Sequence, residues 1–193
     1  MQILLIRHGK TIHGERKQYQ GALDTSLSEG GRAALIKAEQ IPERIYVSPL
    51  KRARETAEIL FPGAELFVTE GLSEMNFGAF EGRSWKEMEN DAAYRAWVEG
   101  NCEGKCPGGE DRKEFTERVC RAFRELTEEA LKDGMEKIAV VAHGGTQMAV
   151  MEKWSGLDRQ YWEWQTECGA GWVLDTGRWP EQLEVSDSVR YTR

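Results

Sequence analysis

Two apolar stretches decide the fold of this chain: residues 1–9 read MQILLIRHG and residues 138–145 read IAVVAHGG. Each is a short run of Ile, Leu, Val or Ala closed by glycine, which is typical of an interior strand of a parallel sheet. Each run also leads into a histidine, His8 or His143, and the chain has only three histidines. Because ligand sites of open α/β sheets gather at the carboxyl ends of the strands, we expect both imidazole rings at one rim.

Length, charge and hydropathy limit the class of protein. A chain of 193 residues is usually one domain with its own core, and no apolar stretch is long enough to span a bilayer. The N-terminal run lacks the basic leader and cleavage site of a signal peptide, so we expect a cytoplasmic protein. The net charge of −7 argues against nucleic acid or an anionic membrane as a partner. An anionic substrate therefore needs a local pocket of positive charge.

The cysteines give little indication of a metal site. Their positions form no paired zinc framework, and in a chain of this length they fit reduced thiols. The spacing of Cys102 and Cys106 is only a weak metal or redox signal. We therefore predict neither a metal ion nor a cofactor.

Hydrophobic periodicity predicts an alternation of strands and helices between and after the two histidine runs. Further strands are expected at 45–47, 65–68, 171–174 and 183–189, of which the last two have weak patterns. Helices are expected at 28–40, 50–60, 84–100, 110–133 and 146–154. Ser48 and Pro49 indicate the start of the helix at 50–60. With no internal repeat or linker, this order predicts a single domain over residues 1–193, a three-layer α/β/α sandwich with a mostly parallel sheet.

Positive charge also gathers at the predicted rim. Arg7 ends the first strand, and Arg52 lies in the first turn of a helix that directly follows a strand. A helix N-terminus has unpaired N–H groups and a positive dipole, so a cation there does not stabilise the helix. An arginine at this position instead indicates an anion-binding site. The glycine turn after His143 repeats this arrangement. The combined positive field suits a phosphate group.

Each of these residues also has a purely structural interpretation when it is taken alone. His8 can be a partly buried histidine held by a backbone carbonyl. Arg52 can be a solvated surface charge, and Glu74 can be a loop carboxylate that is solvated or paired with Arg7. Only their convergence on one site favours a functional interpretation.

Four segments occur in a fixed order: LIRHGKT (5–11), SPLKRARETA (48–57), LSEMNFGAFEG (72–82) and VAHGG (141–145). Together they resemble the motifs of the histidine phosphatase superfamily, the phosphoglycerate mutase-like group, over residue 3 to about residue 150. Within it, YQG (19–21) with Asp24, EMNFG (74–78) and PGGE (107–110) are most similar to the alpha-ribazole phosphatase branch. The resemblance implies a phosphoglycerate mutase-like fold.

The resemblance also implies a mechanism. His8 would attack phosphorus through a neutral ring nitrogen and form a phosphohistidine. Arg7, Arg52 and His143 would hold the phosphoryl oxygens, and this electrostatic task needs no metal. Glu74 matches the position that protonates the leaving alcohol and then activates water.

Supporting roles follow from the same resemblance. Thr11 and the backbone at Gly144 would add hydrogen-bond donors to the phosphate, and the loop at Gln20 and Gly21 would reach the substrate. Many members carry Asn where this chain has Gly14. That phosphate hydrogen bond is therefore absent or supplied by another residue.

Two other residues are alternatives for roles in the proposed site, one for the missing Asn and one for the acid. His13 can replace the missing Asn, although we expect it to be an exposed loop residue. Glu81 rivals Glu74 as the acid, although beside Gly82 it is expected to cap the following helix.

Residues 75–110 are expected to form a lid-like insertion over the reaction centre, where substrate choice is usually made. An aromatic substrate can stack there on Trp85 or Trp97. Core packing is the preferred interpretation for the tryptophans around the C-terminal elements, Trp154, Trp162, Trp164, Trp172 and Trp179.

The sequence thus favours a metal-independent phosphomonoester hydrolase acting on a small phosphorylated substrate, for which alpha-ribazole 5′-phosphate is one candidate. A phosphoglycerate mutase-type phosphotransferase is the first alternative. Cofactor-dependent mutases that resemble this chain usually carry a longer segment between the third and fourth motifs, which favours hydrolysis. A phospho-ligand binding protein without catalysis is the second alternative. The oligomeric state and the physiological ester are not predicted.

Overall fold

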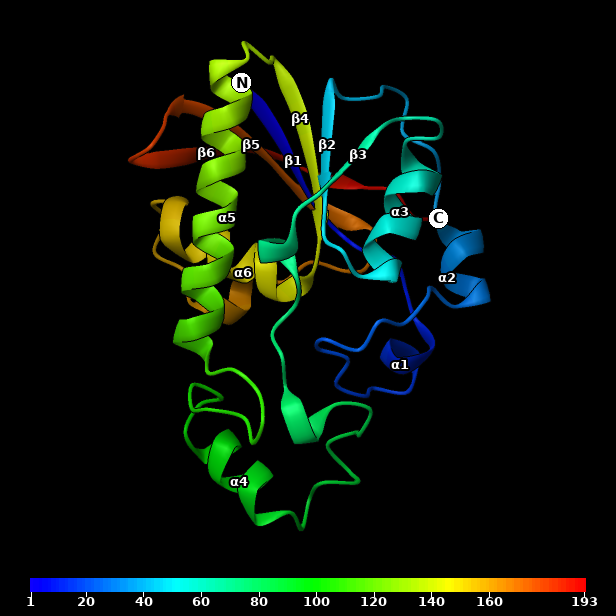
Figure 1. Cartoon of the computed structure of the whole chain (residues 1–193), viewed down its shortest axis with the longest axis vertical. Helices are drawn as coiled ribbons and strands as arrows, with labels where there is room; N and C mark the ends of the chain where they lie inside the picture. Colours follow the sequence, from blue (N-terminus) through cyan, green and yellow to red (C-terminus); the bar gives the residue numbers. More distant parts are fainter.

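A six-stranded sheet forms the centre of the computed structural model, which describes residues 1–193 (Figure 1). The strand order is β3-β2-β4-β1-β5-β6. The strands are β1 (Gln2–Arg7), β2 (Arg44–Val47), β3 (Leu66–Val68), β4 (Lys137–Ala142), β5 (Ala170–Arg178) and β6 (Gln182–Arg190). The first four pair in parallel, whereas β5 and β6 pair antiparallel. The prediction of a mostly parallel sheet is confirmed.

Helices cover both faces of this sheet. The α-helices are α1 (Ile12–Glu15), α2 (Glu29–Ala34), α3 (Lys51–Leu60), α4 (Ala92–Glu99), α5 (Arg112–Lys132) and α6 (Gly144–Trp154), and the 3₁₀ helices are η1 (Glu70–Leu72), η2 (Gly78–Phe80) and η3 (Tyr161–Trp164). Ile3 and Leu5 of β1 pack with α5 and α6, whereas Leu4 and Ile6 pack with α3 on the other face. All four side chains are buried, which explains the unbroken apolar run.

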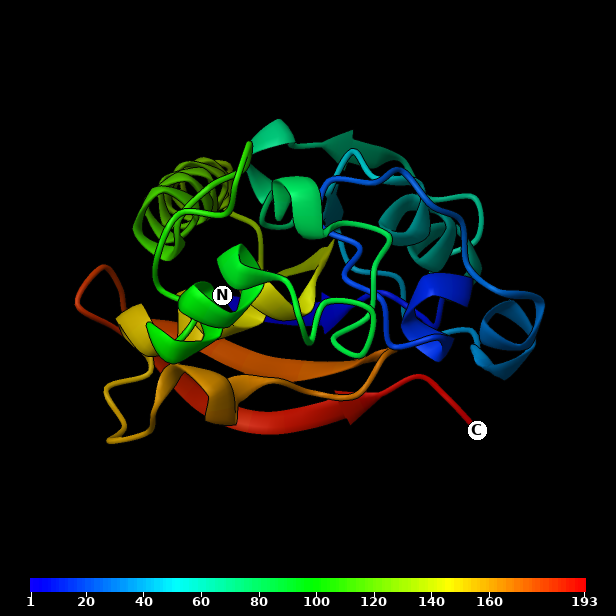
Figure 2. The same ribbon diagram turned by 90° about the horizontal axis from the view of Figure 1, so that it is seen from below.

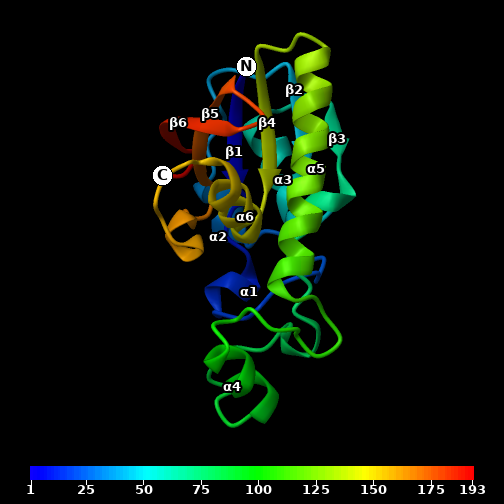
Figure 3. The same ribbon diagram turned by 90° about the vertical axis from the view of Figure 1, so that its left-hand side faces the viewer.

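The segment at 75–110 lies apart from these layers. It contains η2 and α4 and extends beyond the carboxyl ends of the parallel strands, below the sheet in Figures 1 and 3. Seen from that side in Figure 2, it lies across the end of the sheet. This position suits a lid, and the function of a lid stays a prediction.

The longest helix, α5, is predicted correctly over 110–133. Asp111 and Glu114 form a capping box at its start, and its buried face carries apolar residues at helical spacing. None of the helices combines the length and the hydrophobicity that a membrane span requires.

Two predicted helices are shorter than expected. The helix at 84–100 is wrong in its first half, where residues 84–91 form a bridge and turns. Helix α4 begins only after Asp91, whose carboxylate accepts two backbone N–H groups. The helix at 28–40 ends with α2, because the backbone becomes extended at the buried Leu35 and pairs there with the C-terminal segment.

The start of α3 also differs from the prediction. The N–H group of Lys51 donates to Oδ1 of Asp24 at 2.6 Å. The hydroxyl of Ser48 accepts only the N–H of Leu50, which precedes the helix, at 3.4 Å. The expected cap at Ser48, with Pro49 as first residue, is therefore wrong. A carboxylate from a distant loop takes the place of the local cap.

Candidate active site

Three polar side chains follow three neighbouring parallel strands. His8 follows β1, Ser48 follows β2 and His143 follows β4, and the ladder places Ile6 and Val47 opposite the same residue of β4, Val141. The rings of His8 and His143 have centroids 5.2 Å apart and are inclined by 62°. Both are buried. The structure thus brings the two histidines of the apolar runs to one rim.

The His8 ring is held in one tautomer. Its Nδ1 lies 2.7 Å from the carbonyl oxygen of Gly9, and because a carbonyl only accepts, Nδ1 carries the proton. Burial, with Arg52 and Arg7 nearby, holds the pKa of His8 well below its usual 6.5. At neutral pH the ring is therefore uncharged, and Nε2 has its lone pair free.

The His143 ring is fixed by a neighbouring strand. Its Nε2 lies 2.7 Å from Oγ of Ser48, whereas its Nδ1 is buried and has no protein partner. Burial, and then the charge of Arg52, lowers the pKa of His143 well below 6.5. The ring keeps one unpaired nitrogen, which is buried, and His143 does not itself line the cavity described below.

Two arginines bring uncompensated positive charge to these rings. Arg52 is fully buried and donates to the carbonyl oxygens of Leu23 and Gly21, at 2.7 Å each. Arg7 donates to the carbonyl oxygen of Thr166 at 2.6 Å. Neither guanidinium forms an ion pair, and each has a buried Nε without a partner. A buried charge without a counter-ion favours an anionic ligand, so Arg52 is not the solvated surface charge considered above.

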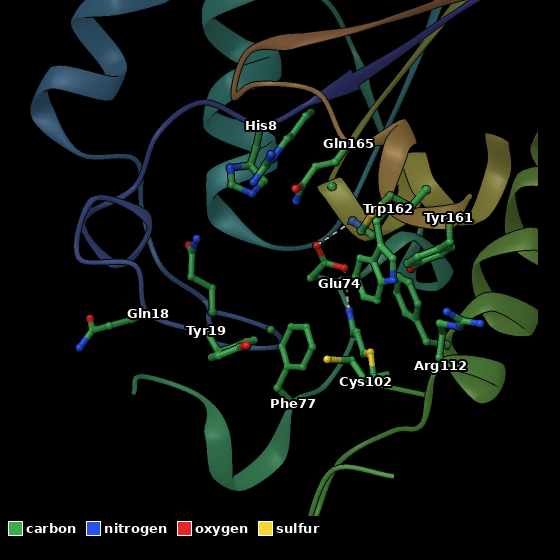
Figure 4. Close-up of a pocket in the computed structure, with 18 of the residues that line it drawn as sticks. His8, Gln18, Tyr19, Glu74, Phe77, Cys102, Arg112, Tyr161, Trp162 and Gln165 are labelled. Atoms are coloured by element: carbon green, nitrogen blue, oxygen red, sulfur yellow. Dashed lines mark hydrogen bonds between the residues drawn. The ribbon is translucent and has the colours of Figure 1, made fainter. Parts of the chain in front are cut away.

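Glu74 is not the loop carboxylate considered above, because backbone N–H groups bind it and it forms no ion pair with Arg7. Its Oε2 accepts the N–H of Gly145 at 3.2 Å, and its Oε1 accepts the N–H of Met75 at 3.0 Å. A Cβ on Gly145 would overlap this carboxylate, so only glycine allows the approach. Figure 4 shows the Glu74 carboxylate and the His8 ring at the same cavity.

This cavity has a volume of about 310 Å³. Arg7, His8, Arg52 and Glu74 line one part of it, together with the expected substrate-binding residues Gln20, Gly21 and Gly144. Aromatic side chains line the rest, and Tyr19 lies against Phe77 and Trp97 with ring centroids 5.2 and 5.9 Å apart. Most of the predicted phosphate-binding groups therefore share one space with an apolar chamber, whereas His143 lies behind this wall.

Thr11 lies in a different position from its proposed one. It does not line the cavity, because its hydroxyl donates to Oε1 of Gln20 at 2.7 Å and accepts the N–H of Gly14 at 3.0 Å, capping α1. A Cβ on Gly14 would lie 3.5 Å from Nε2 of Gln20. The Gln20 amide thus lies beside the missing Asn side chain, whereas His13 does not reach the cavity.

The expected cap at Glu81 is wrong. No helix follows it directly, and its carboxylate accepts the N–H groups of Ala22, at 2.7 Å, and Phe77, at 3.0 Å. Glu81 thereby ties the loop around Gly21 to the segment after Glu74.

Several residues of the site are not identified from the sequence, among them Ser48, Trp162 and Gln165. Ser48 was interpreted as a helix cap, although its place directly after a strand is the same as that of His8 and His143. Trp162 was assigned to the core, but it is 50% exposed and lines the cavity. Gln165 lines the cavity from the same segment, and no pattern in the sequence identifies it.

The buried histidines predict a pH dependence of stability. Because the pKa values of His8 and His143 are lowered in the folded state, the unfolded chain binds more protons below pH 6.5. The free energy of unfolding should therefore fall as pH decreases, by about 1.4 kcal/mol per histidine for each unit below 6.5. Denaturant unfolding at pH 7.5, 6.5 and 5.5 measures this. Equal stability at all three values would contradict it.

Comparisons with known proteins agree with this geometry. The sequence profile of the histidine phosphatase superfamily (branch 1) matches residues 3–178. The metal-independent phosphoserine phosphatase of Arabidopsis thaliana is 31% identical over 160 residues, which are 77% of this chain and 66% of that protein.

Two solved structures show the same fold. The alpha-ribazole phosphatase from Shigella flexneri has a TM-score of 0.82 at 22% identity and covers 100% of this chain and 96% of its own. The phosphoglycerate mutase from Thermus thermophilus has a TM-score of 0.69 at 28% identity and covers 96% of this chain and 97% of its own. The profile match over most of the chain establishes that this protein belongs to the histidine phosphatase superfamily.

Proposed function

We propose that this protein hydrolyses phosphomonoesters of small organic molecules through a phosphohistidine formed on His8, without a metal ion. The observation that carries the proposal is the state of the His8 ring. Its Nδ1 is bound by the carbonyl of Gly9 and its pKa is lowered, which leaves Nε2 as an uncharged nucleophile beside two unpaired guanidinium groups.

In the first step, Nε2 of His8 forms a bond to phosphorus while the bond from phosphorus to the alcohol oxygen breaks. Glu74, in its protonated form, gives its proton to the leaving oxygen. Arg7, Arg52 and Nδ1 of His143 bind the phosphoryl oxygens, whose charge they stabilise during the transfer.

In the second step, the Glu74 carboxylate takes a proton from a water molecule as the water oxygen attacks phosphorus. The bond between phosphorus and Nε2 breaks, inorganic phosphate leaves and His8 returns to its neutral form. The N–H groups of Gly145 and Met75 hold the Glu74 carboxyl group in position.

Three substrates have specific support. The motif resemblance and the fold of the Shigella flexneri enzyme favour alpha-ribazole 5′-phosphate. The name of the Arabidopsis thaliana relative points to phosphoserine. A mutase reaction on phosphoglycerate is the second candidate function, because the Thermus thermophilus structure has this fold, but the short segment between the third and fourth motifs favours hydrolysis.

The test is a phosphate-release assay in EDTA with alpha-ribazole 5′-phosphate, phosphoserine and 3-phosphoglycerate. We expect release from at least one ester that does not depend on added metal. Isomerisation of 3-phosphoglycerate without phosphate release would support the mutase instead. Binding of esters without either reaction would show a phospho-ligand binding protein.

Gly145→Ala should lower kcat by at least about tenfold, because the added methyl group would overlap both the Glu74 carboxylate and the ring of Phe115, and small displacements of a catalytic group are costly. The reference variant is Gly177→Ala, since a Cβ on Gly177 meets no atom within 4 Å. Phosphate release by both variants measures the effect. A wild-type rate for Gly145→Ala would show that the position of Glu74 is unimportant.

A further inference from the structure

We infer that the substrate's alcohol is uncharged and carries a planar ring, which stacks on Trp162, so that Trp162 determines specificity. This inference rests on the proposed function, since the phosphate of the same substrate would occupy the site at His8. It concerns the part of the cavity that the mechanism does not use.

The first observation is the wall of this part of the cavity. Tyr19 and Phe77 lie on one side of it and Tyr161 and Trp162 on the other (Figure 4). Tyr161 is buried, with 5% of its surface exposed, whereas Trp162 is 50% exposed. The two rings pack perpendicular to each other with centroids 4.8 Å apart, which holds the indole in place. Trp162 therefore offers apolar surface that a flat ligand can cover.

The second observation is the lack of a free cation in this chamber. Arg7 and Arg52 flank His8 and serve the phosphoryl group. The remaining arginine of the lining, Arg112, donates to Oε1 of Glu103 at 2.7 Å, and its guanidinium carbon lies 5.1 Å from the centre of the Tyr161 ring. A carboxylate on the alcohol, as in phosphoserine or phosphoglycerate, would have to compete with Glu103 for Arg112, the one cation of this chamber outside the phosphate site.

The third observation is the polar groups that remain. Three amide side chains, Gln18, Gln20 and Gln165, line the cavity. The Oε1 of Gln20 already accepts hydrogen bonds from Thr11 and Thr25, so its NH₂ group is available as a donor. Neutral amides suit hydroxyl groups, as on a sugar that joins the phosphate to the ring.

The fourth observation is space. A second cavity of about 540 Å³ shares Cys102, Arg112, Tyr161 and Trp162 with the first. Trp162 thus lies where two cavities meet. An alcohol the size of serine would leave most of this space empty, whereas a ring attached to a sugar reaches the indole.

The experiment compares kcat/KM for esters that differ in ring and charge: alpha-ribazole 5′-phosphate and a ribonucleoside 5′-monophosphate against glycerol phosphate and phosphoserine. We expect the ring-bearing esters to be preferred. Trp162→Ala should lower kcat/KM for them about tenfold and leave glycerol phosphate within about twofold. Trp162→Phe should restore most of the loss, since a planar ring remains.

The matched control is Trp85→Ala. Trp85 is exposed to nearly the same extent, 49%, but it does not line either cavity. Its substitution should therefore leave kcat/KM unchanged for both classes of ester. Higher kcat/KM for phosphoserine than for the ring-bearing esters would overturn the inference. An equal loss for all esters in Trp162→Ala would also overturn it, because that result indicates a structural role.

Calorimetric binding to His8→Ala separates this inference from the proposed function. If the wild-type protein hydrolyses no ester, the proposed function fails. Tighter binding of a ribonucleoside 5′-monophosphate than of phosphoserine, lost on adding Trp162→Ala, would still support a site for ring-bearing phosphates. Equal binding of both ligands would overturn the inference independently of catalysis.

Discussion

His8→Ala is expected to abolish phosphoester hydrolysis, with kcat reduced by at least about 10⁴-fold. No other residue that lines the cavity offers a neutral imidazole. His143 does not line it, and its Nε2 lies against Ser48. The cavity has no serine, threonine or lysine, and its one cysteine, Cys102, has a pKa raised by burial. The variant keeps Arg7, Arg52 and His143, so it should still bind phosphate esters.

Phosphoryl trapping measures this effect directly. Wild-type protein mixed with an ester labelled in its phosphate and denatured in base should retain label on a histidine, whereas His8→Ala should retain none. Circular dichroism checks that the variant is folded. Label on the variant protein, or hydrolysis at the wild-type rate, would show that another residue is the nucleophile.

Glu74→Gln should slow hydrolysis by about 10²- to 10⁴-fold for alkyl phosphates, the range that general acid–base catalysis supplies. An amide oxygen can still accept one of the two N–H groups, that of Gly145, and only the N–H of Met75 loses its acceptor. The amide has nearly the same shape as the carboxyl group, but it cannot give a proton to the alcohol. An ester with a good leaving group, such as 4-nitrophenyl phosphate, needs no such proton in the first step. Its burst of nitrophenol should therefore be much less affected, although water attack in the second step remains slow.

Glu81→Gln is the matched comparison for this prediction. Glu81 is the rival acid, but its carboxylate is engaged with the backbone of Ala22 and Phe77. Its substitution should therefore change the hydrolysis rates of alkyl and nitrophenyl esters to a similar degree. If Glu74→Gln instead slows the nitrophenol burst as much as alkyl ester hydrolysis, Glu74 does not act as the acid.

The sheet and the histidine rim could be predicted because they depend on strong local patterns. A strand buried on both faces must be apolar throughout, so β1 and β4 stand out in the sequence, and parallel pairing then places their following residues together. Helix α5 could be predicted for a similar reason, since its apolar face and capping residues are contained within the segment itself.

The errors arose where tertiary contacts decide local structure. Helix α3 is capped by Asp24, which is distant in sequence. The local Ser-Pro pattern therefore indicated Ser48 as the cap, since nothing in the sequence shows that the loop at Asp24 reaches this helix. Leu35 leaves the helical pattern because it is buried against other elements. Trp162 could not be placed at the cavity, since its exposure depends on how η3 packs against α6 and Arg112, which no periodicity encodes.

The way in which Arg52 is held has a consequence for how this protein can diverge. Its two partners in the loop are main-chain oxygens, those of Gly21 and Leu23, and main-chain oxygens are retained whatever side chains the loop carries. Gly21 itself is restricted, because its φ is +51° and a Cβ there would overlap Glu81. At Leu23, by contrast, mutation can alter the side chain and leave the guanidinium anchored. New substrate preferences can therefore evolve in this loop while the phosphate-binding charge stays in place.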